Sequence, residues 1–211
     1  MVVFDIDGTL LDSAPGIVAC FIAALESVGF DPPDASELRR DLGPPVEDVF
    51  TTLGLAGEHL GAAVSTYRQL YHRFGLQQSI PYEGIAEVLQ TLQAAGTVLA
   101  TATAKRTETA QAILSHHQLT QCFDVVNGTD DLHRTKSETL SHTLALLGHP
   151  RTDTVVMVGD RHSDVRAARA CGVRPIAVSW GYGSGAELAS TGATTIRRPP
   201  ELLEVLGRAN G

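Results

Sequence analysis

The stretch VVFDIDGTLLDS, residues 2–13, places two aspartates one residue apart at the end of an apolar run. The run Val2–Phe4 is short, continuous and apolar, which is typical of a buried strand. Two carboxylates as close as those of Asp5 and Asp7 repel each other unless positive charge lies between them. What the rest of the chain brings to this point therefore decides how the stretch is interpreted.

Composition and charge limit the classes of protein to consider. The chain has 211 residues, which favours one core domain with a smaller inserted domain. Hydrophobic residues make up 43% and charged residues 19%, as in ordinary globular proteins. The net charge of -8, without a basic run, predicts no nucleic-acid partner and no membrane partner. We expect a cytoplasmic protein because no signal-peptide pattern or bilayer-length apolar run is seen. The oligomeric state cannot be predicted.

Helical and strand patterns alternate after residue 80, and this predicts a parallel sheet. Continuous apolar strands alternating with helices are typical of sheets covered on both faces, so we expect an α/β fold. The expected strands are Val2–Phe4, 97–102, 123–126, 154–158, 175–179 and a brief one near Thr194. The expected helices of this part are 85–92, 106–117, 137–147, 163–170, one near Ala186 and one from Pro200.

The segment after the first strand reads differently. From about Ile17 to Gly75 only helical patterns occur, in pieces broken by prolines and glycines. The sequence therefore predicts a small all-helical domain at residues 15–80, inserted into a core made of residues 1–14 and 81–211. Hinges are expected near residues 13–16 and 79–84.

Polar residues follow several predicted strands at their carboxyl ends, where ligands bind in sheets of this kind. The residues at these positions are Asp5, Asp7, Thr103, Lys105, Lys136, Asp160 and Asp164. Each alone has an ordinary structural interpretation, as a helix cap, a turn residue or a solvated charge. Together, at one edge of one sheet, they indicate a site. Lys105 and Lys136 are the two lysines of the chain.

This set of residues suits phosphoryl transfer through an aspartyl phosphate. Carboxylate oxygens bind Mg²⁺, which would lie between Asp5 and Asp160 and shield the nucleophile from the phosphate that it attacks. Asp7 would protonate the leaving oxygen and later activate water. Gly8 would let the backbone turn sharply beside the phosphate, while Thr103 and Lys136 would stabilise its oxygens.

Four motifs in this order resemble those of the haloacid dehalogenase-like superfamily of phosphatases. They are DIDGTLLDS at 5–13, ATATAK at 100–105, Lys136, and VVMVGDRHSD at 155–164. The resemblance implies a Rossmann-like core with a type-one helical cap and Mg²⁺ as cofactor. It also implies Asp5 as nucleophile and Asp7 as general acid and base. GPP at 43–45, PYEG at 81–84 and SWGYG at 179–183 look most like the phosphoglycolate phosphatase-like branch.

The resemblance also implies a set of binding residues. The metal set is Asp5, Asp7 (through its backbone carbonyl), Asp160 and Asp164. The phosphate-binding set is Ile6, Gly8, Thr103, Ala104 and Lys136. Substrate selection is assigned to the cap, with Arg40, Gly43, Pro44 and Pro45 as candidates and with Tyr67 and Tyr71 among further polar side chains.

The predicted function is hydrolysis of a small phosphorylated metabolite, either phosphoglycolate-like or a nucleotide or sugar phosphate. Two alternatives remain open: a sugar phosphomutase of the same superfamily, and a catalytically silent protein that binds phosphate or metal. The segment 181–186 also fits the GxGxxA pattern of dinucleotide-binding folds, but no strand ending in an acid follows at the expected distance. We interpret it as a loop near the site.

Overall fold

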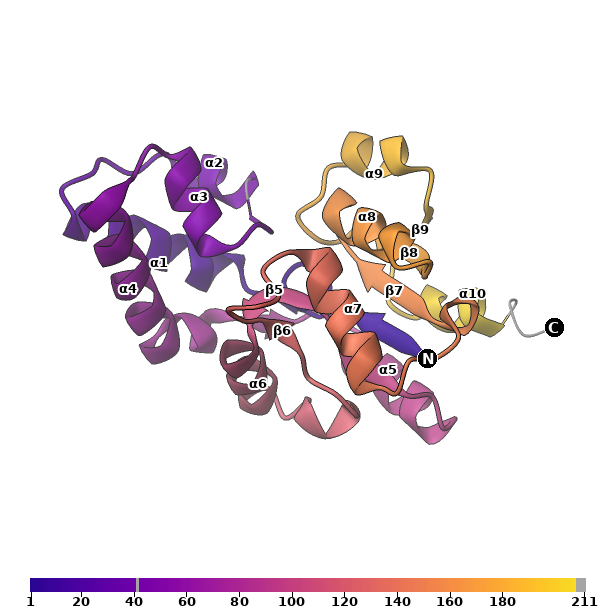
Figure 1. Ribbon diagram of the computed structural model, residues 1–211. Coiled ribbons are helices and arrows are strands. Elements are labelled where there is room, and N and C mark those ends of the chain that lie inside the picture. The colour runs from indigo at the N-terminus through magenta and orange to yellow at the C-terminus, as the bar shows by residue number, and fades with distance from the viewer. Residues whose placement is uncertain (41, 208–211) are drawn as a thin grey trace. The chain divides into compact units, whose positions relative to one another are not determined.

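The computed structural model describes residues 1–40 and 42–207 (Figure 1). Residue 41 of the predicted cap and residues 208–211 of the predicted core lie outside the described residues. The chain divides into two compact units: Met1–Asp12 together with the chain from Pro81 onward, and the inserted segment Ser13–Ile80. No helix in the described ranges is both long and apolar enough to cross a membrane.

A five-stranded parallel sheet forms the centre of the first unit. Its strands are β1 (Val2–Phe4), β4 (Leu99–Thr101), β7 (Val156–Gly159), β8 (Arg174–Val178) and β9 (Thr194–Ile196), in the order β4-β1-β7-β8-β9. Strand β1 lies between β4 and β7, so that Phe4 pairs with Thr101 on one side and with Val158 on the other. The first strand of the chain is therefore interior to the sheet, which explains why it is apolar throughout.

Helices cover both faces of this sheet, and the expected α/β fold class is confirmed. The helices of this unit are α5 (Ile85–Ala94), α6 (Thr107–His116), α7 (Lys136–Leu146), α8 (His162–Ala170), α9 (Gly185–Thr191) and α10 (Glu201–Gly207). On one face Leu140 of α7 and Ala167 of α8 pack with Val3 and Met157 in a single buried cluster. Helices α5 and α10 contact each other on the opposite face (Figure 1).

The predicted strand at residues 123–126 was wrong. Only Val125 forms an isolated bridge, to Ala100, and the regular strand is β6 (Gly128–Thr129), paired with β5 (Thr103–Arg106). The reason is Asp124, whose carboxylate accepts a hydrogen bond from the Leu99 amide at 2.9 Å, in place of a continuing backbone ladder. The apolar pattern predicted that this segment passes beside β4, but it did not predict which residues pair with that strand.

The inserted unit is all-helical and has its own core. It contains α1 (Ala14–Ser27), α2 (Ala35–Arg40), α3 (Val46–Thr52), α4 (Gly57–Arg73) and the short 3-10 helix η1 (Gly75–Gln78). The Phe21 ring lies 4.9 Å from that of Phe50 and 4.6 Å from that of Tyr67. Tyr71 stacks on Tyr67, and both side chains are buried. These tyrosines, named among the possible substrate contacts, thus pack in the core of this unit.

Short elements complete the description. The 3-10 turn η2 (Thr120–Cys122) precedes the segment around Val125, and the 3-10 turn η3 (Thr152–Thr154) precedes β7. Strands β2 (Leu11–Asp12) and β3 (Ile80–Pro81) pair where the chain leaves the first unit and returns to it.

Asn127 ties the sheet edge to α7, and we predict that it is required for stability. Its side-chain nitrogen donates to the Thr139 carbonyl at 3.2 Å and to Thr143 Oγ1 at 2.9 Å, and the residue is 3% exposed. Asn127→Ala should lower the free energy of unfolding by about 1–3 kcal/mol, because buried acceptors lose their donor. Urea denaturation measures this, with the exposed Gln111→Ala as control. An equal effect in both variants would contradict the assignment.

Candidate active site

Asp5 and Asp160 lie side by side because their strands are neighbours. Asp5 follows β1, Asp160 follows β7, and the Asp5 amide donates to the Val158 carbonyl at 2.9 Å. Both side chains are buried. Parallel pairing thus places two acids at the carboxyl edge of the sheet, as predicted from the sequence.

Lys136 supplies positive charge to this edge. Its Nζ lies 2.7 Å from Asp5 Oδ2 and 2.8 Å from Asp164 Oδ1, and its side chain is 9% exposed. Burial alone would lower the pKa of Lys136, but the carboxylates of Asp164 and Asp5 raise it above its usual value. The ammonium is therefore protonated at neutral pH.

The position of Lys136 is set by its helix. It is the first residue of α7, and Thr135 caps that helix by accepting a hydrogen bond from the Glu138 amide at 3.2 Å. Glu138 in turn accepts from the Thr135 amide at 2.9 Å, which completes a capping box. The start of α7 is thus fixed by local hydrogen bonds, and Lys136 with it.

Three buried carboxylates lie close together here, and two of them contact the Lys136 ammonium. Asp5, Asp160 and Asp164 each offer an oxygen, and the three oxygens lie within 4.8 Å of one another. Burial, with the nearby charges of Asp164 and Asp5, raises the pKa of Asp160 well above its usual value. Burial also raises the pKa of Asp164, although Lys136 opposes that effect. The three carboxylates carry more negative charge than Lys136 neutralises, and every donor atom is an oxygen, so the set fits Mg²⁺.

Asp7 has a different partner. Its Oδ2 lies 2.9 Å from Lys105 Nζ, and the two side chains are 16% and 8% exposed. The four acids of the predicted metal set thus divide in the structure: the carboxylates of three form the cluster, and that of Asp7 pairs with Lys105. The sequence placed Lys105 at this edge of the sheet but assigned it no role, and the structure pairs it with Asp7.

The predicted phosphate-binding residues surround the same edge. Thr103 is 1% exposed, and its hydroxyl oxygen accepts from the Lys105 amide at 3.4 Å. The Ala104 carbonyl accepts from Thr129 Oγ1 at 3.1 Å. The Ile6 amide donates to Asp5 Oδ1 at 2.8 Å, and the Gly8 amide donates to the Leu11 carbonyl at 2.9 Å. Both of these amides are thus engaged within their own loop.

The GxGxxA segment at residues 181–186 contributes a hydrogen bond to Asp160. The Tyr182 amide donates to Asp160 Oδ2 at 2.7 Å, and Thr9 Oγ1 donates to Asp160 Oδ1 at 3.4 Å. A Cβ on Gly8, whose φ is 75°, would overlap the Asp160 carboxylate. A Cβ on Gly181 would overlap the Asp160 side chain as well, so these two glycines allow both loops to approach Asp160 closely. The Tyr182 amide was missed by sequence reasoning, because a backbone contact leaves no side-chain signal.

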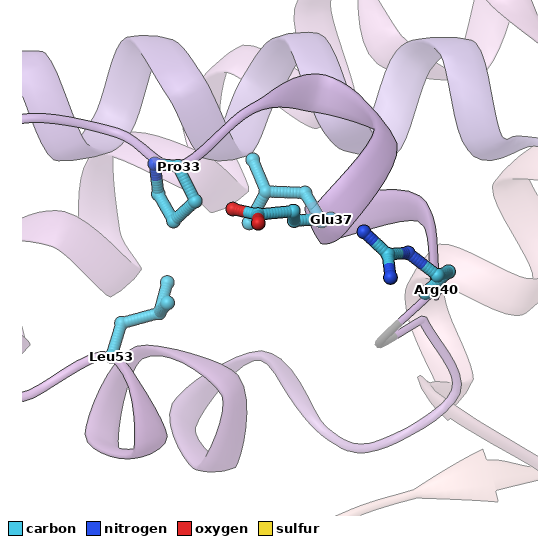
Figure 2. A pocket seen from close by; sticks show the side chains of 5 residues that line it. Pro33, Glu37, Arg40 and Leu53 are labelled. Carbon is cyan, nitrogen blue, oxygen red and sulfur yellow. The ribbon is translucent and has the colours of Figure 1, made fainter.

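The inserted unit carries a pocket of about 310 Å³, shown in Figure 2. Its lining residues are Pro33, Glu37, Leu38, Arg40 and Leu53. Of the predicted specificity residues, Arg40 therefore lines a pocket, and its Nε donates to the Ser36 carbonyl at 3.2 Å. Gly43 and Pro44 lie in the connection before α3, and Pro45 is the N-cap residue of that helix.

Comparison with known proteins identifies the class. A family model of haloacid dehalogenase-like hydrolases matches residues 2–178, and the chain belongs to this family. The predicted family and the prediction of a hydrolytic enzyme are therefore confirmed.

Relatives within the family carry different names. Tyrosine-protein kinase PtkA of Mycobacterium tuberculosis is 39% identical in an alignment that covers 98% of this chain and 72% of the kinase. A phosphoglycolate phosphatase from Aliivibrio fischeri is 30% identical over 88% of this chain and 86% of that enzyme. The crystal structure of a predicted phosphatase from Clostridium acetobutylicum has a TM-score of 0.92 and 31% identity, covering 98% and 97% of the two chains. The predicted likeness to phosphoglycolate phosphatases is thus confirmed.

Glu187 holds the loop that follows Asp160. Its Oε1 accepts from Arg161 Nε at 3.0 Å and from the backbone amide of His162 at 2.8 Å, and it lies 2.8 Å from the Nδ1 of the His162 ring. Burial would raise the pKa of Glu187, but these contacts lower it from 4.5 to about 2. A carboxyl whose pKa is lower in the folded protein stabilises the fold at pH values above its pKa in the unfolded chain. This contribution is lost as the pH falls toward its pKa in the folded protein.

We predict that Glu187→Gln lowers the free energy of unfolding by about 1–3 kcal/mol at neutral pH. The difference from the parent protein should shrink as the pH falls from 4.5 toward 2. Urea denaturation along a pH series measures this, with the exposed Glu108→Gln as control. A difference that does not change with pH would contradict an ionised Glu187.

Proposed function

We propose that the chain is a Mg²⁺-dependent phosphatase that hydrolyses a small phosphomonoester through an aspartyl phosphate on Asp5. The observation that carries the proposal is the cluster of Asp5, Asp160 and Asp164, in which Lys136 contacts Asp5 and Asp164. Beside it, Asp7 in the loop after β1 pairs with Lys105 of β5. A nucleophile, metal ligands and an acid–base group are the parts that such chemistry requires. The family supports the same reaction class.

Asp5, Asp160 and Asp164 would hold the metal, together with the backbone carbonyl of Asp7. Bound Mg²⁺ would supply positive charge that offsets the charge of the phosphate and of the carboxylates. The cluster as it stands favours such an ion, because burial makes the ionised form of Asp160 costly. A cation would restore the ionised form.

Asp5 would act as the nucleophile. Its Oδ1 accepts from the Ile6 amide and its Oδ2 from Lys136, so both oxygens are oriented before substrate arrives. One carboxylate oxygen would form a bond to phosphorus while the ester oxygen leaves. Lys136 and the Thr103 hydroxyl would bind the phosphoryl oxygens during this transfer.

Asp7 would handle the protons. It lies two residues after the nucleophile and is held by Lys105 at 2.9 Å, which fixes its orientation. The carboxyl group would give a proton to the leaving oxygen in the first step. In the second step the carboxylate would take a proton from the water that attacks the aspartyl phosphate, which returns Asp5 to its starting form.

Substrate selection would be the task of the inserted unit, acting as a cap. Residues that bind only the phosphate cannot distinguish one ester from another, so selectivity requires contacts to the leaving group. Arg40 is the candidate that the structure favours, because it lines the pocket of this unit together with Glu37. Phosphoglycolate, nucleoside monophosphates and sugar phosphates are the classes to compare.

A second candidate function is phosphoryl transfer to a protein tyrosine. It is favoured by the 39% identity to PtkA, which extends over 98% of this chain. The chain covers 72% of that kinase, so the remainder of the kinase has no counterpart in this match. ATP with a tyrosine peptide therefore belongs in the substrate panel, beside a sugar phosphate for the phosphomutase alternative.

Asp5→Asn should abolish phosphate release while the protein stays folded, since the amide is nearly isosteric but is not a nucleophile. The measurement is phosphate release from the panel with Mg²⁺ and with chelator, alongside Asp153→Asn, which alters an exposed aspartate paired with Arg151. Release that requires Mg²⁺ and is kept in the control supports the proposal. Release that persists in Asp5→Asn contradicts it, and transfer to peptide or sugar in place of water favours the alternatives.

Lys136→Met should reduce phosphate release by about 100-fold or more, because one fixed positive charge on the phosphoryl group is lost. The variant should also lose about 3–5 kcal/mol of stability, since Asp5 and Asp164 keep their burial without their partner. Thermal unfolding with and without Mg²⁺ tests the second point, and the metal should stabilise the variant more than the parent. Arg151→Met, at a pair that is 82% and 64% exposed, is the control.

A further inference from the structure

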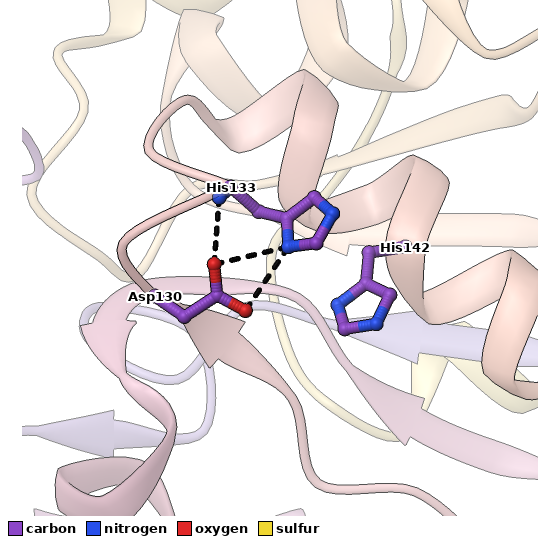
Figure 3. Close-up of side chains that lie close together, drawn as sticks. All are labelled: Asp130, His133 and His142. Atoms are coloured by element: carbon purple, nitrogen blue, oxygen red, sulfur yellow. Dashed lines mark hydrogen bonds and ion pairs between the residues drawn. The ribbon is translucent and has the colours of Figure 1, made fainter.

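Asp130, His133 and His142 form a second group of side chains that could bind a metal ion. Asp130 and His133 lie in the loop between β6 and α7, and His142 lies on α7 (Figure 3). Each offers one ligand atom, and these atoms lie within 4.8 Å of one another. None of the three belongs to the carboxylate cluster that contacts Lys136.

The Asp130 carboxylate is fixed in place by its own loop. Its Oδ1 accepts from the Leu132 amide at 2.8 Å and from the His133 amide at 2.6 Å. Nδ1 of His133 lies 3.0 Å from each of the two carboxylate oxygens. Two of the three ligand groups are therefore already directed at each other, and the backbone holds the acid without the imidazole.

His142 lacks a partner where one is expected. Its Nδ1 is buried and has no hydrogen-bond partner among the described residues. The His142 ring stacks on that of His133 with centroids 4.0 Å apart and planes at 11°. Figure 3 shows one ring nitrogen of His142 facing the Asp130 carboxylate. A buried polar atom without a partner requires an explanation, and an ion or a water is the usual one.

We propose that Asp130, His133 and His142 bind a divalent transition-metal ion of the Zn²⁺ class, with water completing the coordination. Two imidazole nitrogens and one carboxylate oxygen are a donor set that suits Zn²⁺ rather than Mg²⁺. Bonds of about 2.0–2.1 Å to a tetrahedral ion place ligand atoms about 3.4 Å apart, so the present separations need only small side-chain movements.

The chain fixes the spacing of the three ligands. The capping box of Thr135 and Glu138 sets the start of α7 between His133 and His142. The ion would replace the proton now shared between His133 Nδ1 and Asp130, and it would give His142 Nδ1 a partner. The two sites of this unit would then differ in ion, oxygen donors at the sheet edge taking Mg²⁺ and nitrogen donors here taking Zn²⁺.

The test is calorimetric titration of the full chain with Zn²⁺ in the presence of excess Mg²⁺, which would occupy the carboxylate cluster under the proposed function. One Zn²⁺ site is expected, and His133→Gln and His142→Gln should each weaken it by about tenfold or more. His59→Gln, which changes an exposed histidine of α4, should leave the affinity unchanged. Co²⁺ should give the visible absorption of a nitrogen-containing site of low coordination number, and both variants should lose it.

Absence of Zn²⁺ binding in the parent protein would overturn the proposal, and so would equal affinity in the parent and both variants. Circular dichroism checks that the variants are folded. If they are not, imidazole NMR of the parent protein decides the question. Zn²⁺ should shift the ring signals of His133 and His142 and leave that of His59 unchanged, and any other pattern contradicts the assignment.

Discussion

A single ammonium group bridges two buried carboxylates at the carboxyl edge of the parallel sheet, and the site is built around it. Lys136 touches Asp5 and Asp164, which lie far apart in the sequence and are brought together by β1 and the start of α8. Removing a charge of this kind from water is costly, and the cost is recovered only when the partners are well placed. The capping box of α7 and the pairing of β1 with β7 provide that placement.

The same arrangement suits the binding of a cation and an anion together. One ammonium does not balance three buried acids, so Asp160 is costly to ionise until a cation arrives. A divalent cation would neutralise the three ionised acids and the ammonium taken together, so that a phosphate dianion would meet far less repulsion there. Binding of the two is therefore expected to be mutually favourable, because each offsets the charge that opposes the other. Low dielectric around the group strengthens this coupling.

Much of this could be predicted from residue types and spacing. Acids and lysines after apolar strands indicated Asp5, Asp160 and Lys136 because parallel strands end at one edge. The alternation of strands and helices indicated the fold class, and prolines and glycines marked the helical insertion. The register at Val125 could not be predicted, since it depends on one side chain, Asp124, that takes the place of a backbone acceptor.

Contacts made by the backbone, or between residues far apart in the sequence, could not be predicted from the sequence either. The Tyr182 amide that holds Asp160 has no side-chain signature, and a glycine-rich pattern there resembled a different kind of loop. Tyr67 and Tyr71 were among the possible substrate contacts, and a tyrosine carries both a ring that packs and a hydroxyl that can bind. Which of the two matters depends on packing, and here Phe21 and Phe50 surround the Tyr67 ring.

The scarcity of lysine has a practical consequence for handling the protein. Both lysines of the chain are buried at the sheet edge, with side chains 8% and 9% exposed, and each is paired with an aspartate. Reagents that acylate amines need an accessible, neutral amine, and a protonated ammonium between carboxylates is neither. Lysine-directed dyes, cross-linkers and resin couplings would thus find no open lysine on the described surface. A reagent that did reach Lys136 would remove the charge on which Asp5 and Asp164 depend.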